Sequence, residues 1–251
     1  MNIAIITGAS SGLGLEFYKE LQKEALDEIW IIARRKERLE ENKDKFGKIK
    51  TKIVPMDITV RENISLLDEM LSREDINVKF LINNAGFGAY GDVASSSFEV
   101  QGDMVDLNVR ALTEITTVVL KYMHERDYII NTCSIASFVP NGNLVVYSST
   151  KAYVMSFSKG LRYELKKRKI NVTAVCPGPM STEFLSVAGI EKGTSKMFDM
   201  LPRTNPNTVA KKSIRAAKRG RAVYTPLFLF KLYRVLAKLL PHSLLIPICK
   251  S

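Results

Sequence analysis

Short apolar strands and amphipathic helices alternate along the chain from its first residues. Strand character is found at residues 2–7, 28–33, 50–57, 78–85, 127–134 and 170–178. Helical periodicity is found at residues 13–25, 35–46, 62–74, 98–125 and 146–167. This alternation is typical of a parallel sheet with helices on both faces. With 251 residues and 46% hydrophobic content, we predict an α/β protein with a single-domain, doubly wound parallel sheet.

Two segments depart from this alternation. Residues 177–206 are irregular but contain the apolar clusters "EFLSVAGI" and "KMFDML". A long loop after the carboxyl end of a strand lies where open α/β sheets bind ligands. We therefore predict a substrate lid at 179–206, with a surface helical insertion as the alternative. The main domain is predicted at 1–225 and a C-terminal amphipathic helical extension at 226–251.

The C-terminal extension is both apolar and basic. Residues 200–251 hold eleven basic residues and no acidic ones, which indicates an anionic partner. A helix from about 227 to 240 would be ~21 Å long, too short to cross a membrane core of ~30 Å, and Pro241 should end it. Three fates remain open: packing over a substrate cleft, a subunit contact, or peripheral contact with an anionic membrane. The charges in this helix share one narrow face and are Lys231, Arg234 and Lys238.

A glycine-rich loop, "TGASSGLG", follows the first strand and opens the first helix. Gly8 permits a sharp turn, Gly12 allows close approach of the backbone, and Gly14 lets the helix pack closely. Free N–H groups and the positive end of the helix would then face a pyrophosphate. The spacing G-x-x-x-G-x-G differs from the standard dinucleotide fingerprint, but the strand–loop–helix context supports nucleotide binding. The remaining loop residues predicted to contact the nucleotide are Ser10, Ser11 and Leu13.

The second strand ends in "IIARRK", where a protein that binds NAD usually places an acidic residue against the ribose 2′-hydroxyl. Ala33 stands at that position, and Arg34 and Arg35 follow. Because a guanidinium pairs well with a phosphate, these residues favour NADP(H) over NAD(H). The alternative is a solvated, charged helix start.

The stretch "VVYSSTKAYV" places Tyr147 and Lys151 one helical turn apart on the same face. A free tyrosine has a pKa near ~10 and is a poor acid–base catalyst at neutral pH. A nearby ammonium favours the phenolate, so we expect Lys151 to lower the pKa of Tyr147.

Together these features resemble the short-chain dehydrogenase/reductase family, over residues 2 to about 225. The resemblance rests on "TGASSGLG", Asp57 in "VPMDIT", "NNAG" (83–86) and Asn108 in "DLNV". It continues with Ser134 in "TCSIAS", the Tyr147–Lys151 pair and "PGPMST" (177–182). It implies a Rossmann-like fold and an oxidoreductase that interconverts C=O and CH–OH groups.

The resemblance also implies roles for individual residues. The catalytic set would be Asn108, Ser134, Tyr147 and Lys151, with Tyr147 as the proton donor and Ser134 bound to the substrate oxygen. Lys151 would also hold the nicotinamide ribose, and Asn108 would hold a water that links Lys151 to solvent. Asp57 would contact the adenine, and Thr182 would bind the nicotinamide carboxamide. The other cofactor contacts would be Ile58, Asn83, Ala85, Gly86, Pro177 and Gly178.

The substrate is less constrained than the reaction. The pocket is expected to be apolar, which favours a steroid or lipid-like ketone or alcohol. One alternative is a 3-oxoacyl thioester, with a carrier held by the basic cluster Lys211, Lys212, Arg215, Lys218 and Arg219. Another is a non-catalytic NADP sensor or scaffold. The predicted substrate contacts are Ser134, Tyr147, Phe87, Ile135, Phe138 and Phe184, in a lining that also includes Val139, Leu144, Met180, Leu185, Met197 and Phe198.

Other classes of protein are not favoured. Cys133, Cys176 and Cys249 are scattered, and His124 and His242 are isolated, so neither disulfides nor a metal site is expected. No signal peptide or nucleic-acid motif is visible. We therefore expect a cytoplasmic protein, with membrane contact through the extension left open, and the resemblance adds a homodimer or homotetramer.

Overall fold

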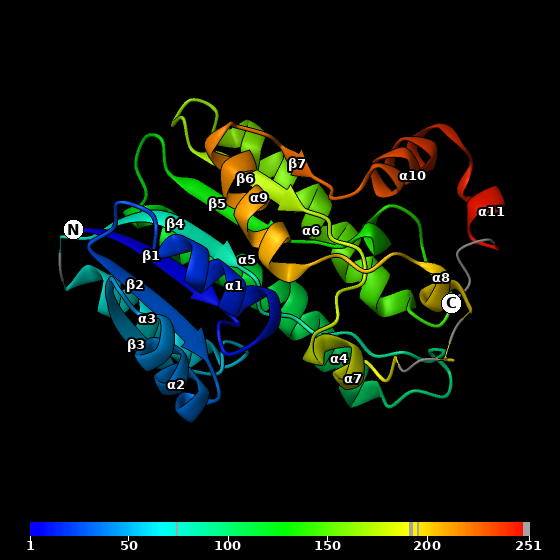
Figure 1. The fold of residues 1–251 in the computed structure, drawn as a ribbon, viewed down its shortest axis with the longest axis horizontal. Coiled ribbons are helices and arrows are strands. Elements are labelled where there is room, and N and C mark those ends of the chain that lie inside the picture. Colours follow the sequence, from blue (N-terminus) through cyan, green and yellow to red (C-terminus); the bar gives the residue numbers. More distant parts are fainter. Residues whose placement is uncertain (74, 191–192, 195, 248–251) are drawn as a thin grey trace.

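The computed structural model describes residues 1–73, 75–190, 193–194 and 196–247, with no account of the side chains of 196 and 197. The described chain forms a seven-stranded, all-parallel sheet in the order β3-β2-β1-β4-β5-β6-β7 (Figure 1). This arrangement confirms the predicted Rossmann-like fold. The strands are β1 (Asn2–Thr7), β2 (Glu28–Ala33), β3 (Lys50–Pro55), β4 (Asn77–Asn83), β5 (Tyr128–Thr132), β6 (Asn171–Val175) and β7 (Val223–Tyr224).

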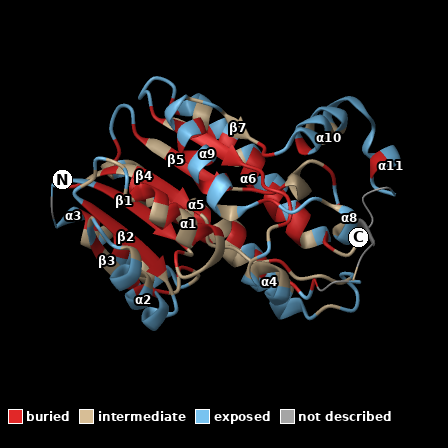
Figure 2. Cartoon of the chain, viewed as in Figure 1, coloured by how far each residue is buried: buried red, intermediate tan, exposed pale blue. Residues whose placement is uncertain are grey.

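Helices cover both faces of the sheet, and the strands alternate between two cores. Ile3 and Ile5 of β1 pack with α3 (Arg61–Ser72) and α5 (Leu112–Val119). Ala4 and Ile6 point to the opposite face, where the covering helices are α1 (Gly12–Leu21), α2 (Lys36–Phe46) and α9 (Pro206–Lys218). The sheet is therefore apolar on both sides, and Figure 2 shows buried strands inside partly exposed helices.

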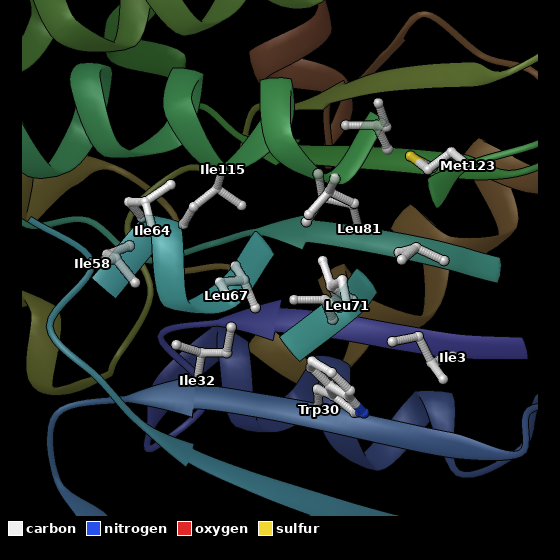
Figure 3. Close-up of a cluster of buried hydrophobic side chains, with 14 of the residues drawn as sticks. Ile3, Trp30, Ile32, Ile58, Ile64, Leu67, Leu71, Leu81, Ile115 and Met123 are labelled. Carbon is white, nitrogen blue, oxygen red and sulfur yellow. The ribbon is translucent and has the colours of Figure 1, made fainter. Parts of the chain in front are cut away.

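The core on the α3–α5 side is shown in Figure 3. Trp30 of β2 lies beneath Leu67 and Leu71 of α3, and Leu81 of β4 packs toward Ile115 of α5. These five side chains are fully buried. Burial of a side chain of this size contributes about 1.5–3 kcal/mol, so this layer holds the strand ends that carry the loops of the site in fixed positions.

The helix expected at 98–125 is not continuous. It consists of α4 (Phe98–Val105), a π-helical turn η1 (Asp106–Ala111), α5, and a short 3₁₀ turn η2 (Leu120–Tyr122) that ends before the extended Met123. π-helical turns often occur at functional sites, and η1 contains Asn108. The Asn108 side chain makes tertiary hydrogen bonds to the backbone of Phe87 and to Thr150. Hydrophobic periodicity does not reveal this change of helical pitch.

The C-terminal third adds elements beyond the strand–helix alternation. The described part of the segment predicted as a lid contains two short helices, α7 (Glu183–Val187) and α8 (Lys196–Met200). Strand β7 was not predicted, because its two residues carry no readable pattern. The long helix α6 (Val145–Glu164) ends three residues before the predicted end at 167. The extension forms α10 (Phe228–Leu239) and, after Pro241, α11 (His242–Leu245).

Among the described residues, no helix is both long and apolar enough to cross a membrane. Within the same residues, no group of three or more histidine, cysteine or acidic side chains is arranged to hold a metal ion. Cys133 and Cys176 are buried free thiols, whereas Cys249 lies outside the described residues.

Candidate active site

A cavity of about 1030 Å³ lies at the carboxyl ends of the strands. Because the strand order brings β2, β1, β4, β5 and β6 side by side, the loops that follow them line one continuous wall. Most of the predicted site residues share this wall: Gly8, Ser10, Ser11, Gly12, Leu13, Arg34, Arg35, Asp57, Ile58, Ala85, Gly86, Phe87, Ser134, Ile135, Tyr147, Lys151, Pro177, Gly178, Thr182 and Phe184. The sequence motifs, widely spaced along the chain, therefore meet at one place.

The glycine loop is built for close contacts. Gly8 has a φ of 68°, which favours glycine, and a Cβ there would lie 2.8 Å from the Cα of Ala85. A Cβ on Gly14 would lie 2.1 Å from the carbonyl oxygen of Gly8. Gly14 therefore lets helix α1 start against its own loop, and it does not line the cavity. This geometry leaves the start of α1 open to an anionic group.

Arg34 and Asp57 lie at the end of the cavity formed by β2 and β3. The Arg34 Nη1 is 3.9 Å from the Asp57 Oδ2, and the Arg34 side chain is 77% exposed. Burial acts to raise the pKa of Asp57, but hydrogen bonds from Thr59 and the charge of Arg34 lower it overall. Arg34 is therefore held loosely and is free to turn toward a ligand.

Arg35 has a different environment from Arg34. Its guanidinium donates hydrogen bonds to Ser10 and Ser11 of the glycine loop and, at 3.0 Å, to Glu183 of α7. Arg38 of α2 also contacts the Glu183 carboxylate. Hydrogen bonds from Arg38 and then Arg35 lower the pKa of Glu183 to about 2. These contacts connect the predicted lid segment to the glycine loop, and neither Arg38 nor Glu183 was among the predicted site residues.

Tyr147, Ser134 and Lys151 lie together in the middle of the cavity wall. Tyr147 and Lys151 come from α6, and Ser134 follows β5 as the cap of a short 3₁₀ turn, η3 (Ile135–Ser137). Lys151 Nζ donates to the carbonyl oxygen of Thr132 at 3.0 Å and lies 5.8 Å from the centre of the Tyr147 ring. All three side chains are buried, so their polar atoms act in a water-poor site.

The expected lowering of the Tyr147 pKa by Lys151 is not observed. Burial raises the pKa of Tyr147 well above that of a free phenol, and a hydrogen bond with Ser134 only partly opposes this shift. Burial also lowers the pKa of Lys151. At its distance from the ring, the buried ammonium does not outweigh desolvation of the phenolate. This protein chain alone therefore keeps Tyr147 protonated, which is the state of a proton donor.

Asn108 is buried behind the cavity and does not line it. Its Nδ2 donates to the carbonyl oxygen of Phe87 at 2.8 Å and to Thr150 Oγ1 at 3.1 Å, and its Oδ1 accepts from the Phe87 N–H at 3.1 Å. A Cβ on Gly86 would lie 2.7 Å from Asn108 Oδ1 and 3.3 Å from Lys151 Nζ. Asn108 thus fixes the loop that packs beside Lys151.

Two residues predicted to contact the cofactor or the substrate lie outside the cavity lining. Asn83 is buried in β4, donates to Thr116 and Asn131, and does not line the cavity. The next residue, Asn84, does line it and bonds to the backbone of Thr7 and Gly8. The shift follows from strand geometry, because successive side chains point to opposite sides. Phe138 also lies outside the cavity lining, where its ring packs 5.7 Å from that of Tyr233.

The other end of the cavity is apolar. Leu144, Met180, Leu185 and Phe198 line it as predicted, whereas Val139 lies behind it and the side chain of Met197 is outside the described residues. Four further residues line this wall and were not predicted to do so: Leu201, and Leu229, Phe230 and Tyr233 of α10. The sequence feature that could have identified the α10 residues is the apolar C-terminal extension, for which packing over a substrate cleft was one of the three predicted possibilities.

The lining fits a nicotinamide dinucleotide. The cavity joins a glycine-rich loop, a pair of arginines beyond it, and a buried Tyr–Lys pair at the opposite end. This sequence of groups matches a pyrophosphate, an adenosine ribose and a nicotinamide in turn. The residues that would hold the cofactor are those of the glycine loop, Arg34, Asp57, Asn84, Lys151 and Thr182.

Comparisons with known proteins agree with this architecture. The family model described as short chain dehydrogenase matches residues 2–192. An uncharacterized oxidoreductase of Staphylococcus epidermidis is 28% identical over 182 residues, covering 72% of this chain and 78% of that protein. A short-chain dehydrogenase from Sphingobium yanoikuyae, solved in complex with NADPH, is 26% identical with a TM-score of 0.81, over 95% of this chain and 93% of that one.

A further solved structure shares the fold. It is a bulky-bulky ketone specific alcohol dehydrogenase from Comamonas testosteroni, 24% identical with a TM-score of 0.77, covering 95% of this chain and 92% of that chain. The chain belongs to the short-chain dehydrogenase/reductase family. Its reaction class is therefore oxidoreduction with a nicotinamide cofactor.

Proposed function

We propose that the protein is an NADP(H)-dependent oxidoreductase that interconverts a ketone and a secondary alcohol on an apolar, steroid- or lipid-like substrate. The observation that carries this proposal is the placement of Tyr147, hydrogen-bonded to Ser134, between an arginine-bearing end of the cavity and an apolar end. The proposed enzyme works in the cytoplasm, at the surface of a membrane.

The residues of this chain have separable tasks in reduction of a ketone. The bound cofactor supplies the hydride. Tyr147 gives its phenolic proton to the substrate oxygen, and Ser134 donates a hydrogen bond to the same oxygen and stabilises its developing charge. Lys151 stands beside the phenol, and its ammonium group stabilises the phenolate that forms when Tyr147 gives up its proton. In the oxidation direction, Tyr147 accepts the proton from the alcohol.

The preference for NADP(H) is supported by the charges at the β2 end of the cavity. Arg34, Arg35 and Arg38 gather there, and Ala33 offers no carboxylate to a ribose 2′-hydroxyl. A 2′-phosphate gains charge-assisted hydrogen bonds from guanidinium groups, whereas a hydroxyl does not.

The apolar substrate class is supported by the wall opposite the arginines. Phe87, Ile135, Leu144 and Phe184 face this part of the cavity, with Leu229 and Phe230 of α10. None of these side chains can form an ion pair with a substrate carboxylate, so a bulky apolar ketone gains most from burial there.

The competing 3-oxoacyl thioester activity has weaker support. Lys211, Lys212 and Arg215 are exposed on α9, and Lys218 is paired with Glu24 at 2.7 Å. This arrangement is that of a solvated helix face. We also propose a homo-oligomer through the helical segments that contain Asn108 and Tyr147, where Val105 of α4 and Tyr153 of α6 are exposed.

The test is a substrate panel. Purified protein is mixed with NADPH or NADH and with a steroid ketone, a 3-oxoacyl thioester or a small ketone, and loss of absorbance of the reduced cofactor is followed. We expect turnover with NADPH and the steroid or another bulky ketone. Faster turnover of the thioester would select the carrier-dependent alternative. No turnover with any substrate, combined with tight NADPH binding, would favour a sensor or scaffold.

A further inference from the structure

Helix α10 has two apolar faces, and the inner face is fixed to the fold. Phe230 is 1% exposed. A Cβ on Gly178 would lie 2.2 Å from the Phe230 ring. Tyr233 and Ala237 pack with the buried pair Val139 and Leu245. The inner face therefore closes the apolar end of the cavity.

The outer face of α10 is also apolar but has no protein cover among the described residues. Phe228 is 80% exposed and Leu239 is 73% exposed, and Leu232 and Val235 are exposed between them. Their spacing places these four residues in one row along the helix. Leu229 and Leu236 widen the row on one side. A contiguous exposed apolar surface of this kind marks a docking site.

The position of α10 leaves this outer face accessible. In Figure 1 the helix stands away from the sheet, at the same end of the molecule as α8 and α11. Figure 2 shows that most of its visible surface is exposed, in contrast to the buried strands.

The charges beside the outer face are all positive. Lys231 and Lys238 are exposed and lie two turns apart on one flank of the apolar row. The sequence contains no acidic residue after Asp199. A second copy of the chain packed along α10 would bring like charges together. An anionic lipid surface instead satisfies the lysines while it accepts the apolar row.

The dimensions of α10 suit contact with a lipid surface and exclude a span. Its 12 residues extend for ~18 Å, less than the ~30 Å of a hydrocarbon core. The helix therefore has to lie in the plane of the interface, with the apolar row down and the lysines at headgroup level.

We propose that the outer face of α10 docks the protein on an anionic lipid surface. Leu229, Phe230 and Tyr233 of the same helix line the cavity, so docking places the apolar end of the cavity beside the bilayer. An apolar substrate then passes from lipid to cavity past one helix. Delivery of substrate depends on the proposed reductase function, whereas docking itself does not.

The experiment is co-sedimentation of the full chain with vesicles of phosphatidylcholine alone or mixed with phosphatidylserine, at low and high salt. One variant combines Phe228→Gln, Leu232→Gln and Leu239→Gln, and a second combines Lys231→Glu and Lys238→Glu. The matched controls are Phe98→Gln with Tyr163→Gln, which are both 80% exposed elsewhere, and Lys211→Glu with Lys212→Glu on α9.

We expect the unmodified protein to sediment with vesicles that contain phosphatidylserine at low salt, and less at high salt. Each α10 variant should lower the partition coefficient by at least about tenfold, whereas the controls should not change it. The charge variant keeps the test decisive if the apolar variant does not fold, because its lysines are exposed.

Three results would overturn the proposal. The first is that the unmodified protein stays in the supernatant with all vesicles. The second is that the control variants lose vesicle binding as much as the α10 variants do. In the third, the apolar variant dissociates an oligomer in analytical ultracentrifugation, which would make the outer face a contact between copies.

A separate assay keeps docking apart from catalysis. The α10 variants should oxidise NADPH with a water-soluble ketone at the unmodified rate, and Tyr147→Phe should still sediment with vesicles. Vesicle binding without turnover would reject the proposed function alone. Turnover without vesicle binding would reject the docking surface alone.

Discussion

The carboxylate of Glu183, in the lid, accepts hydrogen bonds at 3.0 Å from the guanidinium of Arg35, which follows β2. The two residues are 148 positions apart in sequence, and Arg38 shares the same carboxylate. Two guanidinium groups at the proposed 2′-phosphate end of the cavity are thus already partnered by an internal anion. We therefore propose that cofactor choice and the position of the predicted lid are coupled through the Glu183 side chain.

This coupling predicts the effect of Glu183→Gln. Without the competing carboxylate, Arg35 and Arg38 are free for a phosphate, so NADPH should bind about tenfold more tightly while NADH binding changes little. Fluorescence titration with each cofactor measures the ratio. The control is Glu37→Gln, an exposed acid in the first turn of the same helix α2. Weaker binding of NADPH would show instead that Glu183 orients the arginines.

We propose Arg34 as a second determinant of cofactor choice. Because its guanidinium is mostly exposed and 3.9 Å from Asp57, Arg34→Ala removes a phosphate contact without disturbing a tight ion pair. Hydrogen bonds to charged groups contribute ~1.5–3 kcal/mol, so the preference for NADPH in kcat/KM should fall roughly ten- to hundredfold. Lys36→Ala, an exposed cation nearby, is the matched control. Equal kcat/KM values for both cofactors in the unmodified protein would reject this assignment.

Tyr147→Phe tests the proton donor. Loss of general acid catalysis typically costs ~10²–10⁴-fold in rate, so turnover should nearly vanish while NADPH still binds. Tyr153→Phe, on the same helix and hydrogen-bonded to Thr113, should retain full activity. A Tyr147→Phe enzyme with more than about a tenth of the normal rate would exclude the phenol as the donor.

The raised pKa of Tyr147 predicts the pH dependence of both directions. Reduction needs the protonated phenol, which persists to pH values above those for a free phenol, ~10. The kcat/KM for a ketone should therefore stay level from neutral pH to about 10, whereas oxidation of the alcohol should rise with pH. Initial rates in overlapping buffers give both profiles. A fall in reduction centred near neutrality would mean that Lys151 dominates in the cofactor complex.

Asn108→Ala should affect stability as well as catalysis. The amide is 1% exposed, and its loss would leave the N–H and C=O of Phe87 without these partners, whereas Thr150 would keep its hydrogen bond to the carbonyl oxygen of Tyr147. An unsatisfied buried group costs about 1–3 kcal/mol, which thermal or urea unfolding would detect. The control is Asn207→Ala, an exposed residue bonded to Glu16. Unchanged stability would show that water replaces the amide at no cost.

The sheet could be predicted because its first six strands are long and are separated by amphipathic helices. Strand β7 could not, since two residues show no period and pair only through β6. The π-helical turn at Asn108 was also hidden, because tertiary hydrogen bonds accompany it and hydrophobic spacing does not record them. In the same way, adjacent asparagines at 83 and 84 look equivalent in sequence, and only the strand pleat separates their roles.

The resemblance to the family predicted that Ser134, Tyr147 and Lys151 would share one site, and they line the same cavity, but their electrostatics could not be predicted. The sequence shows that Lys151 lies one turn from Tyr147, and burial of both groups then decides the direction of their pKa shifts. The lid contact between Glu183 and Arg38 links segments that no local pattern relates. Which distant charged side chains pair depends on how the loops close over the sheet, and no local pattern in a single sequence indicates these pairs.

The contact between Gly178 and Phe230 limits how this protein can be rebuilt. Any side chain at position 178 would collide with the ring, at 2.2 Å for the first added carbon, and a smaller residue at position 230 would leave a gap beside the turn that follows β6. A chimaera that exchanges α10 with a relative must therefore exchange the Pro177–Gly178 turn as a matched set. Such an exchange would change the substrate range, through α10, and the position of the bound cofactor, through the Pro177–Gly178 turn, at the same time.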